Sequence, residues 1–215
     1  MALIPGDVIQ EGRKRKGLSA QRTSGADEVR ELEAMLAGMR IMIIGGTGSL
    51  GQELLTHLHA RNEVAVFSRD EEKQWKIKNQ YPSDLVTCIL GDIRDYESVY
   101  SALKSYQPDI VINAAALKQI TACEYHPLQS VKTNILGVQH LVDAVNRLGQ
   151  VKTVIGISTD KACQPVNVYG MSKAIQERIY VEANLHCQEI FGSRRFLPRR
   201  WAISPRCSST AGMWR

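Results

Sequence analysis

An acid, two amines and a phenol lie within fourteen residues of this chain, directly after the apolar run Val154–Ile157. Tyr169 and Lys173 are one helical turn apart, so both side chains can face one way, and the ammonium would lower the pKa of the phenol. The phenol could then take a hydroxyl proton while a hydride leaves carbon. Asp160 could protonate a leaving hydroxyl, and Lys161 could remove a proton next to a carbonyl. Ordinary surface pairs are the alternative for both couples.

A glycine-rich turn far upstream, Gly45-x-x-Gly48-x-x-Gly51, also follows an apolar run. The first glycine permits a sharp turn, the second lets the backbone approach a pyrophosphate, and the third allows a helix and a strand to pack closely. Amides at the start of the next helix would then face an anion. The sequence therefore predicts a dinucleotide site, and the turn residues expected at the cofactor are Gly45, Thr47, Gly48, Ser49, Leu50 and Gly51.

The type of dinucleotide depends on the end of the second apolar run, which reads Ser68-Arg69-Asp70. An acid at this place usually binds the ribose of NAD, whereas an arginine offers a planar fork to the 2′-phosphate of NADP. We expect NADP, bound by Ser68 and Arg69. Asp70 keeps NAD open, and Arg69 could instead cap a solvent-facing turn.

Two further strand ends could contact the cofactor. Asp92 follows the third predicted strand and could accept the adenine amino group, with Ile93 beside it, or it could cap a helix. Ala114 and Ala115 follow the fourth strand, where small side chains leave room for ribose and phosphates, or simply for a tight strand end.

Apolar runs alternate with amphipathic stretches between residues 40 and 190. This alternation predicts an α/β fold, a doubly wound parallel sheet with helices on both faces. The expected strands are 41–44, 64–67, 85–90, 110–112 and 154–157, and the expected helices are 50–60, 71–79, 95–105, 127–148 and 169–187. We expect three parts: an extension at 1–38 with a short helix at 26–37, a dinucleotide-binding domain at 39–190, and a basic tail at 191–215, disordered or aberrant.

Composition excludes several classes of protein. Six arginines and no acids lie in residues 194–215, so the net charge of +5 becomes −1 without them, and a basic nucleic-acid-binding face is not expected. No apolar run is long enough to cross a bilayer. Five cysteines without pattern indicate reduced thiols in a cytoplasmic protein, with no metal site expected.

Six stretches in order carry a more specific signal: IIGGTGSLG (43–51), FSRDEEKQ (67–74), GDIRD (91–95), NAAALKQITACEYHP (113–127), KTNILGVQHLVDA (132–144) and STDKACQPVNVYGMSKAIQERI (158–179). Over residues 40–190 the chain resembles the extended short-chain dehydrogenase/reductase family, most closely its polysaccharide-biosynthesis branch, typified by UDP-N-acetylglucosamine 4,6-dehydratases. The resemblance implies transient oxidation at C4 of a UDP-N-acetylhexosamine, proton removal at C5 and loss of water at C6.

By that resemblance, Tyr169 deprotonates the C4 hydroxyl with Lys173 as its partner, Lys161 removes the C5 proton, and Asp160 protonates the C6 hydroxyl. Lys118 matches a position near the substrate, although it could be an ordinary loop lysine. Independently of the resemblance, Thr159 lies at the strand end, where its hydroxyl could hold the substrate or the nicotinamide. The rival hypotheses are a nucleotide-sugar 4-epimerase or reductase, which would not need Lys161, and a non-catalytic dinucleotide-binding protein. A homo-oligomer formed through the two long helices rests on analogy alone.

The resemblance ends after the Tyr/Lys helix. Where the family has a strand similar to R-Y-G-N-V, this chain has Arg200-Trp201-Ala202-Ile203-Ser204. We expect a reading-frame shift near residues 192–198, or a truncated gene, with the sugar-binding domain largely absent. NADP binding without robust turnover is therefore the expectation for the chain as written.

Overall fold

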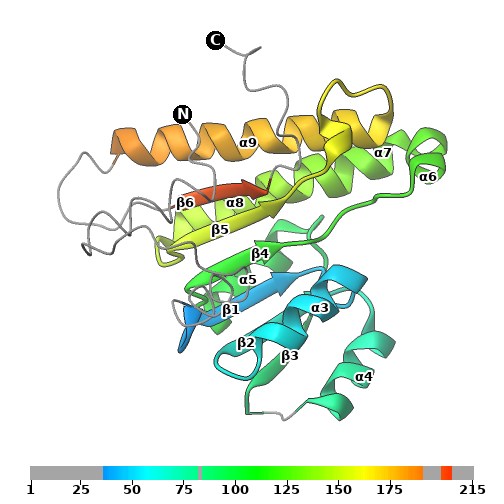
Figure 1. The fold of residues 1–215 in the computed structure, drawn as a ribbon. Coiled ribbons are helices and arrows are strands. Elements are labelled where there is room, and N and C mark those ends of the chain that lie inside the picture. Colours follow the sequence, from blue (N-terminus) through cyan, green and yellow to red (C-terminus); the bar gives the residue numbers. More distant parts are fainter. Residues whose placement is uncertain (1–35, 82–83, 191–199, 205–215) are drawn as a thin grey trace, which may run out of the picture. The chain divides into compact units, whose positions relative to one another are not determined.

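The computed structural model describes residues 36–81, 84–190 and 200–204. In the compact unit Gly38–Arg215, the described strands form one sheet in the order β3-β2-β1-β4-β5-β6, and every neighbouring pair is parallel (Figure 1). The strands are β1 (Arg40–Ile44), β2 (Glu63–Ser68), β3 (Val86–Leu90), β4 (Ile110–Asn113), β5 (Thr153–Ile157) and β6 (Arg200–Ser204). The strand order reverses direction between β1 and β4, the position where doubly wound sheets form a ligand crevice.

The central strands are apolar on both faces, as a covered parallel sheet requires. Ile41 and Ile43 alternate along β1 with Met42 and Ile44, and all four side chains are buried. Met42 and Ile44 belong to a hydrophobic core cluster that includes Val99 of the helix that follows β3. The run 41–44 therefore reads as continuous apolar sequence because its side chains enter two separate layers.

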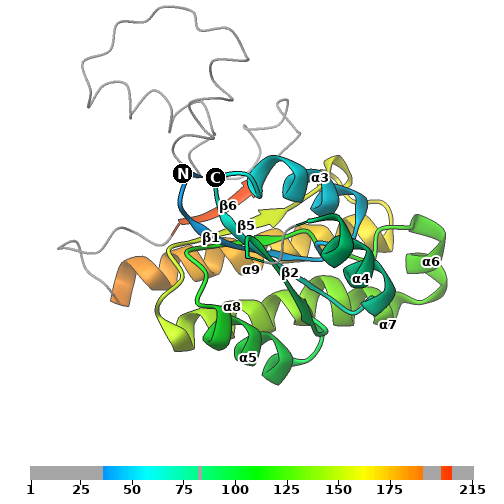
Figure 2. The ribbon, with the colours of Figure 1, turned by 90° about the horizontal axis from the view of Figure 1, so that it is seen from below.

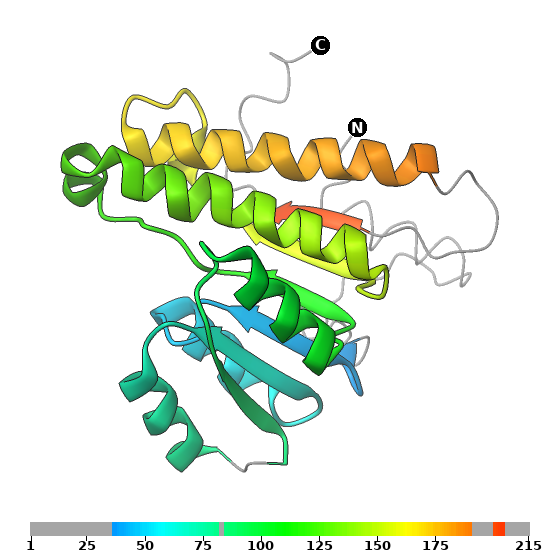
Figure 3. The same cartoon turned by 180° about the vertical axis from the view of Figure 1, so that it is seen from behind.

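Helices connect consecutive strands. They are α3 (Ser49–Leu58), α4 (Glu71–Gln80), α5 (Tyr96–Tyr106), α6 (Ile120–Tyr125), α7 (Pro127–Ser130), the π-helical η1 (Val131–Leu136), α8 (Gly137–Leu148), the 3₁₀ turn η2 (Asp160–Ala162) and α9 (Val168–Ile190). Figure 2 shows α3 on one side of the sheet and α5 with α8 on the other. From behind, α5, α8 and α9 lie in front of the strands (Figure 3). None of the helices in the described part of the chain is both long and apolar enough to span a membrane.

The predicted fold class is confirmed, and the five expected strands begin and end within a residue or two of the observed ones. The expected helix 127–148 is divided into α7, η1 and α8, and the sequence pattern missed α6 and η2, which are too short to show a period. Residues 26–35 of the expected N-terminal helix lie outside the described residues.

The structure differs from the sequence prediction at β6. This strand pairs with β5 from Thr153↔Arg200 to Ile157↔Ser204, inside the segment 191–215 that was expected to form a tail. Sequence periodicity missed β6 because its apolar run, Trp201-Ala202-Ile203, is only three residues long and lies among arginines and prolines. Pairing to a strand edge needs only backbone groups, which leave no mark on composition.

Candidate functional site

The ends of neighbouring strands meet at one edge of the sheet and bring the predicted segments together. Gly45 N donates to Phe67 O at 2.8 Å, joining the ends of β1 and β2. Gly91 N donates to Ser68 O at 2.9 Å, and Ala114 N donates to Ile44 O at 2.9 Å. The turns that follow β1, β2, β3 and β4 therefore lie side by side, as the dinucleotide hypothesis requires.

The glycine turn has no room for larger residues at Gly45 and Gly51. Gly45 has φ +79°, and a Cβ there would lie 2.7 Å from Ala115 N across the β1–β4 crevice. A Cβ on Gly51 would overlap the backbone of Gly46, so α3 could not approach the turn. These are the steric roles that the spacing predicts.

The start of α3 is open to an anion. Its N-cap is Gly48, which has no side chain to cap the helix, and Gly48, Ser49 and Leu50 are exposed. The first amides of a helix lack internal partners and carry the positive end of its dipole. Together with the narrow glycine turn, this open helix start fits a pyrophosphate. Thr47 is buried, and its carbonyl accepts from Gln52 Nε2 at 2.9 Å.

The three candidates at the end of β2 have different surroundings. Ser68 is buried, and its hydroxyl accepts from Gln74 Nε2 at 3.0 Å. Asp70 is the N-cap of α4 and accepts from Lys73 N at 3.0 Å. Arg69 has a half-exposed guanidinium whose Nη1 lies 3.7 Å from Asp92 Oδ2. Arg69 is therefore the member of the trio with the most exposed side chain, although it pairs with Asp92.

Asp92 is held by a neighbouring arginine. Arg94 contacts it with Nε at 2.9 Å and Nη2 at 2.6 Å, and Arg94 N donates to it at 3.0 Å. Burial raises the pKa of Asp92, but the hydrogen bonds from Arg94 outweigh burial and hold it below its usual value. The helix cap considered for Asp92 is supplied instead by Asp95, which accepts from Glu97 N at 3.1 Å. Ile93 is buried.

At the end of β5 the acid and one amine form an exposed cluster. Thr159 Oγ1 donates to Asp160 Oδ1 at 2.9 Å, and Lys161 Nζ lies 3.4 Å from the same oxygen. The hydrogen bond from Thr159, with the charge of Lys161, lowers the pKa of Asp160. In this arrangement Asp160 is therefore a carboxylate at neutral pH.

The turn η2 packs directly on the start of α9. A Cβ on Gly170 would overlap Lys161 O, so only glycine lets the Asp160–Lys161 segment lie against the helix turn that carries Tyr169. Val168 N donates to Glu124 Oε1 at 2.8 Å, which ties the start of α9 to α6. The structure thus brings the acid and amine of η2 next to the phenol-bearing turn.

Lys173 is buried, with 2% of its surface exposed. Its ammonium donates to Ile157 O at 2.5 Å and to Gln176 Oε1 at 2.6 Å. Burial lowers the pKa of Lys173 to about 8, although the charge of Glu177 raises it. Tyr169, one turn earlier, is half-buried. Lys173 therefore lies inside the fold, with its ammonium bound to the last residue of β5.

Sequence reasoning missed a buried polar residue, Asn134. It lies in η1, donates to Leu117 O and Ser172 Oγ at 2.9 Å each, and accepts from Leu117 N at 2.8 Å. Asn134 thereby joins the segment after β4 to α9. Its signal in the sequence was a lone asparagine inside an amphipathic helix. Lys118, on the same segment after β4, is exposed.

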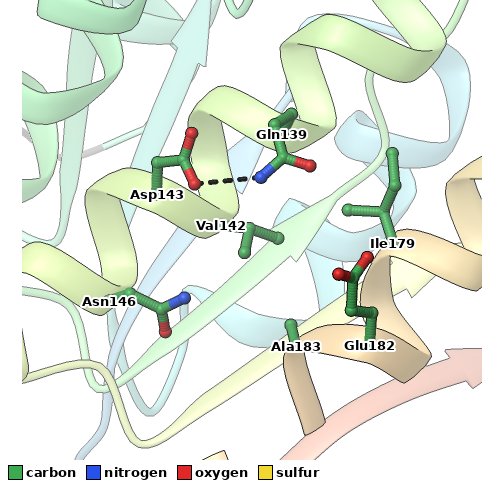
Figure 4. Close-up of a pocket in the computed structure, with 7 residues that line it drawn as sticks. All are labelled: Gln139, Val142, Asp143, Asn146, Ile179, Glu182 and Ala183. Atoms are coloured by element: carbon green, nitrogen blue, oxygen red, sulfur yellow. Dashed lines mark hydrogen bonds between the residues drawn. The ribbon is translucent and has the colours of Figure 1, made fainter. Parts of the chain in front are cut away.

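A shallow groove lies elsewhere, between α8 and α9, and it contains none of the predicted site residues (Figure 4). Its side chains are Gln139, Val142, Asp143, Asn146, Ile179, Glu182 and Ala183. Gln139 Nε2 donates to Asp143 Oδ1 at 2.9 Å along its rim. The groove is separate from the edge of the sheet where the strand ends meet.

Known proteins that are similar to this chain include one protein family and relatives with two different named activities. A family model described as "Polysaccharide biosynthesis protein" matches residues 41–200. The chain is 40% identical over 153 residues to a UDP-N-acetylglucosamine 4,6-dehydratase (inverting) of Campylobacter jejuni, covering 70% of this chain and 45% of that protein. It is 37% identical over 153 residues to a UDP-glucose 4-epimerase of Rickettsia massiliae, covering 68% and 44%.

One solved structure is similar to this chain in both sequence and fold. The X-ray structure of Pen from Bacillus thuringiensis superposes with a TM-score of 0.66 and 34% identity, covering 70% of this chain and 47% of that one. The chain spans about half the length of the curated relatives it matches.

Proposed function

This chain belongs to the polysaccharide biosynthesis protein family, and on that premise we propose that it binds NADP and carries the catalytic half of a UDP-N-acetylhexosamine 4,6-dehydratase. The observation that carries the proposal is the seating of Asp160 and Lys161 on the α9 turn that presents Tyr169, with Lys173 buried behind them. An oxidation at C4 alone would need no acid and amine there.

Cofactor binding is supported by the glycine turn and the open start of α3. The residues proposed to hold the dinucleotide are Gly45, Thr47, Gly48, Ser49, Leu50, Gly51, Ser68, Arg69, Asp92, Ile93, Ala114, Ala115, Tyr169 and Lys173. NADP is favoured over NAD because Asp70 is occupied in capping α4, whereas Arg69 faces solvent with a fork that suits a phosphate. When bound, the nicotinamide supplies a reversible hydride acceptor.

The chain's own residues would then move the protons. Tyr169 takes the proton of the C4 hydroxyl, and Lys173 stabilises the phenolate. The ketone formed at C4 acidifies the proton at C5, which Lys161 removes. Asp160 protonates the hydroxyl that leaves C6 as water, while Thr159 and Lys118 contact the substrate. The hydride removed at C4 is then added at C6 and a proton returns to C5, so that the net reaction is loss of water.

The role of Asp160 requires a change on substrate binding. Its pKa is lowered by the Thr159 hydroxyl and by Lys161, whereas a general acid must be protonated. A sugar hydroxyl that takes the hydrogen bond of Thr159, and a Lys161 turned toward C5, would remove both effects. Burial under the substrate would raise the pKa further.

A second candidate is a nucleotide-sugar 4-epimerase, which the Rickettsia massiliae relative favours. It would use Tyr169 and Lys173 and leave Lys161 without a role. The two candidates differ in their products, because an epimerase conserves the mass of the sugar.

The test combines binding with product analysis. The purified chain is titrated calorimetrically with NADP and with NAD, then incubated with UDP-N-acetylglucosamine and followed by mass spectrometry. We expect tighter binding of NADP, loss of water from the sugar at well below ordinary enzyme rates, and abolition of that loss in Lys161→Met with cofactor affinity kept. Absence of any dinucleotide affinity would refute the cofactor proposal. A product of unchanged mass that chromatography separates from the substrate, and that persists in Lys161→Met, would establish the epimerase.

A further inference from the structure

The buried ammonium of Lys173 has a side-chain acceptor that the proposed mechanism does not use. Gln176, one turn along α9, is 1% exposed, and its Oε1 lies 2.6 Å from Lys173 Nζ. An ammonium only donates hydrogen bonds, so the oxygen of the Gln176 amide must face it. The other acceptor is the main-chain oxygen of Ile157 at the end of β5.

Gln176 is also connected to the turn after β4. Its Nε2 approaches Ile157 O at 3.4 Å, and its side chain hydrogen-bonds the buried hydroxyl of Tyr180. Asn113 Nδ2 donates to the same hydroxyl at 2.9 Å, and Asn113 Oδ1 accepts from Ala115 N at 3.1 Å. A continuous path of hydrogen bonds therefore runs from Lys173 to the backbone at Ala115, and it is buried up to Asn113.

We propose that Gln176 is the positioning residue for Lys173, holding its ammonium at the end of β5, and that Tyr180 and Asn113 tie this position to the turn on which the dinucleotide would lie. The inference rests on the proposed function for its consequence in catalysis, but the contact itself does not depend on turnover. A buried amide that loses its hydrogen-bond partner is unfavourable. A substitution that removes one member of the path should therefore have a measurable effect on the others.

The groups around Lys173 allow the effect of Gln176 on its pKa to be distinguished from the effect of nearby charge. Glu177 on α9 is the charge whose field raises the pKa of Lys173, and its carboxylate accepts a hydrogen bond from Ser158 at the end of β5. The other members of the path, Tyr180 on the same helix and Asn113 on β4, are uncharged. Gln176 differs from Glu177 because it touches the ammonium directly, so its removal should act through a lost hydrogen bond.

The experiment measures the titration of Lys173 itself. The full chain is labelled with lysine carrying ¹³C at Cε, and the Lys173 signal is assigned with Lys173→Arg. We expect Gln176→Met to lower the midpoint by about one pH unit, because a hydrogen bond to a charged group is lost. Gln176→Glu restores an acceptor and should raise the midpoint. Gln139→Met, the same change on α8, should leave the midpoint in place.

A Lys173 midpoint in folded Gln176→Met within about 0.2 pH units of the original would overturn the inference. If Gln176→Met does not fold, Tyr180→Phe is titrated instead; a changed midpoint supports the path, and an unchanged one overturns it. Calorimetric titration with NADP separates the two proposals. If the unaltered chain does not bind NADP, the proposed function is refuted. A lowered Lys173 midpoint in Gln176→Met would still support the role of Gln176.

Discussion

Replacing Lys173 by methionine should make the stability difference between the two proteins depend on pH. Burial lowers the pKa of Lys173 from 10.5 to about 8 in the folded chain, with Glu177 opposing the shift. The folded protein therefore binds this proton less tightly than the unfolded chain does. Below pH 8 both states are protonated and the full penalty of burying the ammonium acts against folding. Above pH 8 the folded state releases the proton, and the penalty declines until about pH 10.5.

The size of the effect follows from the shift. A lowering of about 2.5 units corresponds to about 3 kcal/mol of destabilisation at pH 7, falling to about 2 kcal/mol at pH 9 and about 1 kcal/mol at pH 10. Methionine removes this pH-dependent penalty. It also leaves Ile157 O and Gln176 Oε1 without the ammonium, a loss that is independent of pH over this range. The change with pH is therefore the informative quantity.

Urea denaturation at 25 °C, from pH 7 to pH 10, gives the free energy of unfolding for both proteins. Relative to Lys173→Met, the unaltered chain should gain about 2 kcal/mol over this range. Lys132→Met, at an exposed lysine of η1, controls for the exchange of lysine for methionine as such. A difference between the chain and Lys173→Met that stays constant from pH 7 to pH 10 would refute the reasoning that burial depresses this pKa.

Three other outcomes are expected. Gly45→Ala should lower the free energy of unfolding by more than Gly38→Ala, and abolish dinucleotide affinity in calorimetry, because both glycines have positive φ but only at Gly45 would a Cβ meet backbone. Tyr180→Phe leaves the buried amide of Asn113 short of an acceptor and should cost about 1–3 kcal/mol in urea denaturation, whereas a neutral result would mean that the pair is not formed. Asp95→Ala removes the N-cap of α5 and should cost about 1 kcal/mol, measured in the same way.

Much of the candidate site could be located from local sequence because its parts are local. The glycine turn, the strand ends and the Tyr169–Lys173 spacing each depend on a few consecutive residues. Parallel strands all end at one edge, so the fold class alone brings those segments together. The same reasoning left Asp92 open between two roles, because the sequence does not show that Arg94 folds back onto it.

The polar residues behind the site were not predicted because each is defined by a distant partner. Gln176 and Tyr180 fall at i+3 and i+7 from Lys173, the spacing of one helix face, and a polar stripe at that spacing on a helix that packs on a sheet is the signal that was overlooked. Asn134 gave no such signal, since its partners Leu117 and Ser172 are 17 and 38 residues away.

By itself, the sequence determined which residues can do chemistry and in which order strands and helices follow, because side-chain type and hydrophobic period are written locally. The tertiary structure decided which of those residues are charged, buried or held. Lys173 and Lys161 are both lysines near one strand end, yet one is enclosed by Ile157 and Gln176 while the other is exposed beside Asp160. Desolvation and hydrogen bonding depend on neighbours supplied by other elements of the fold, so only their packing could distinguish the two amines.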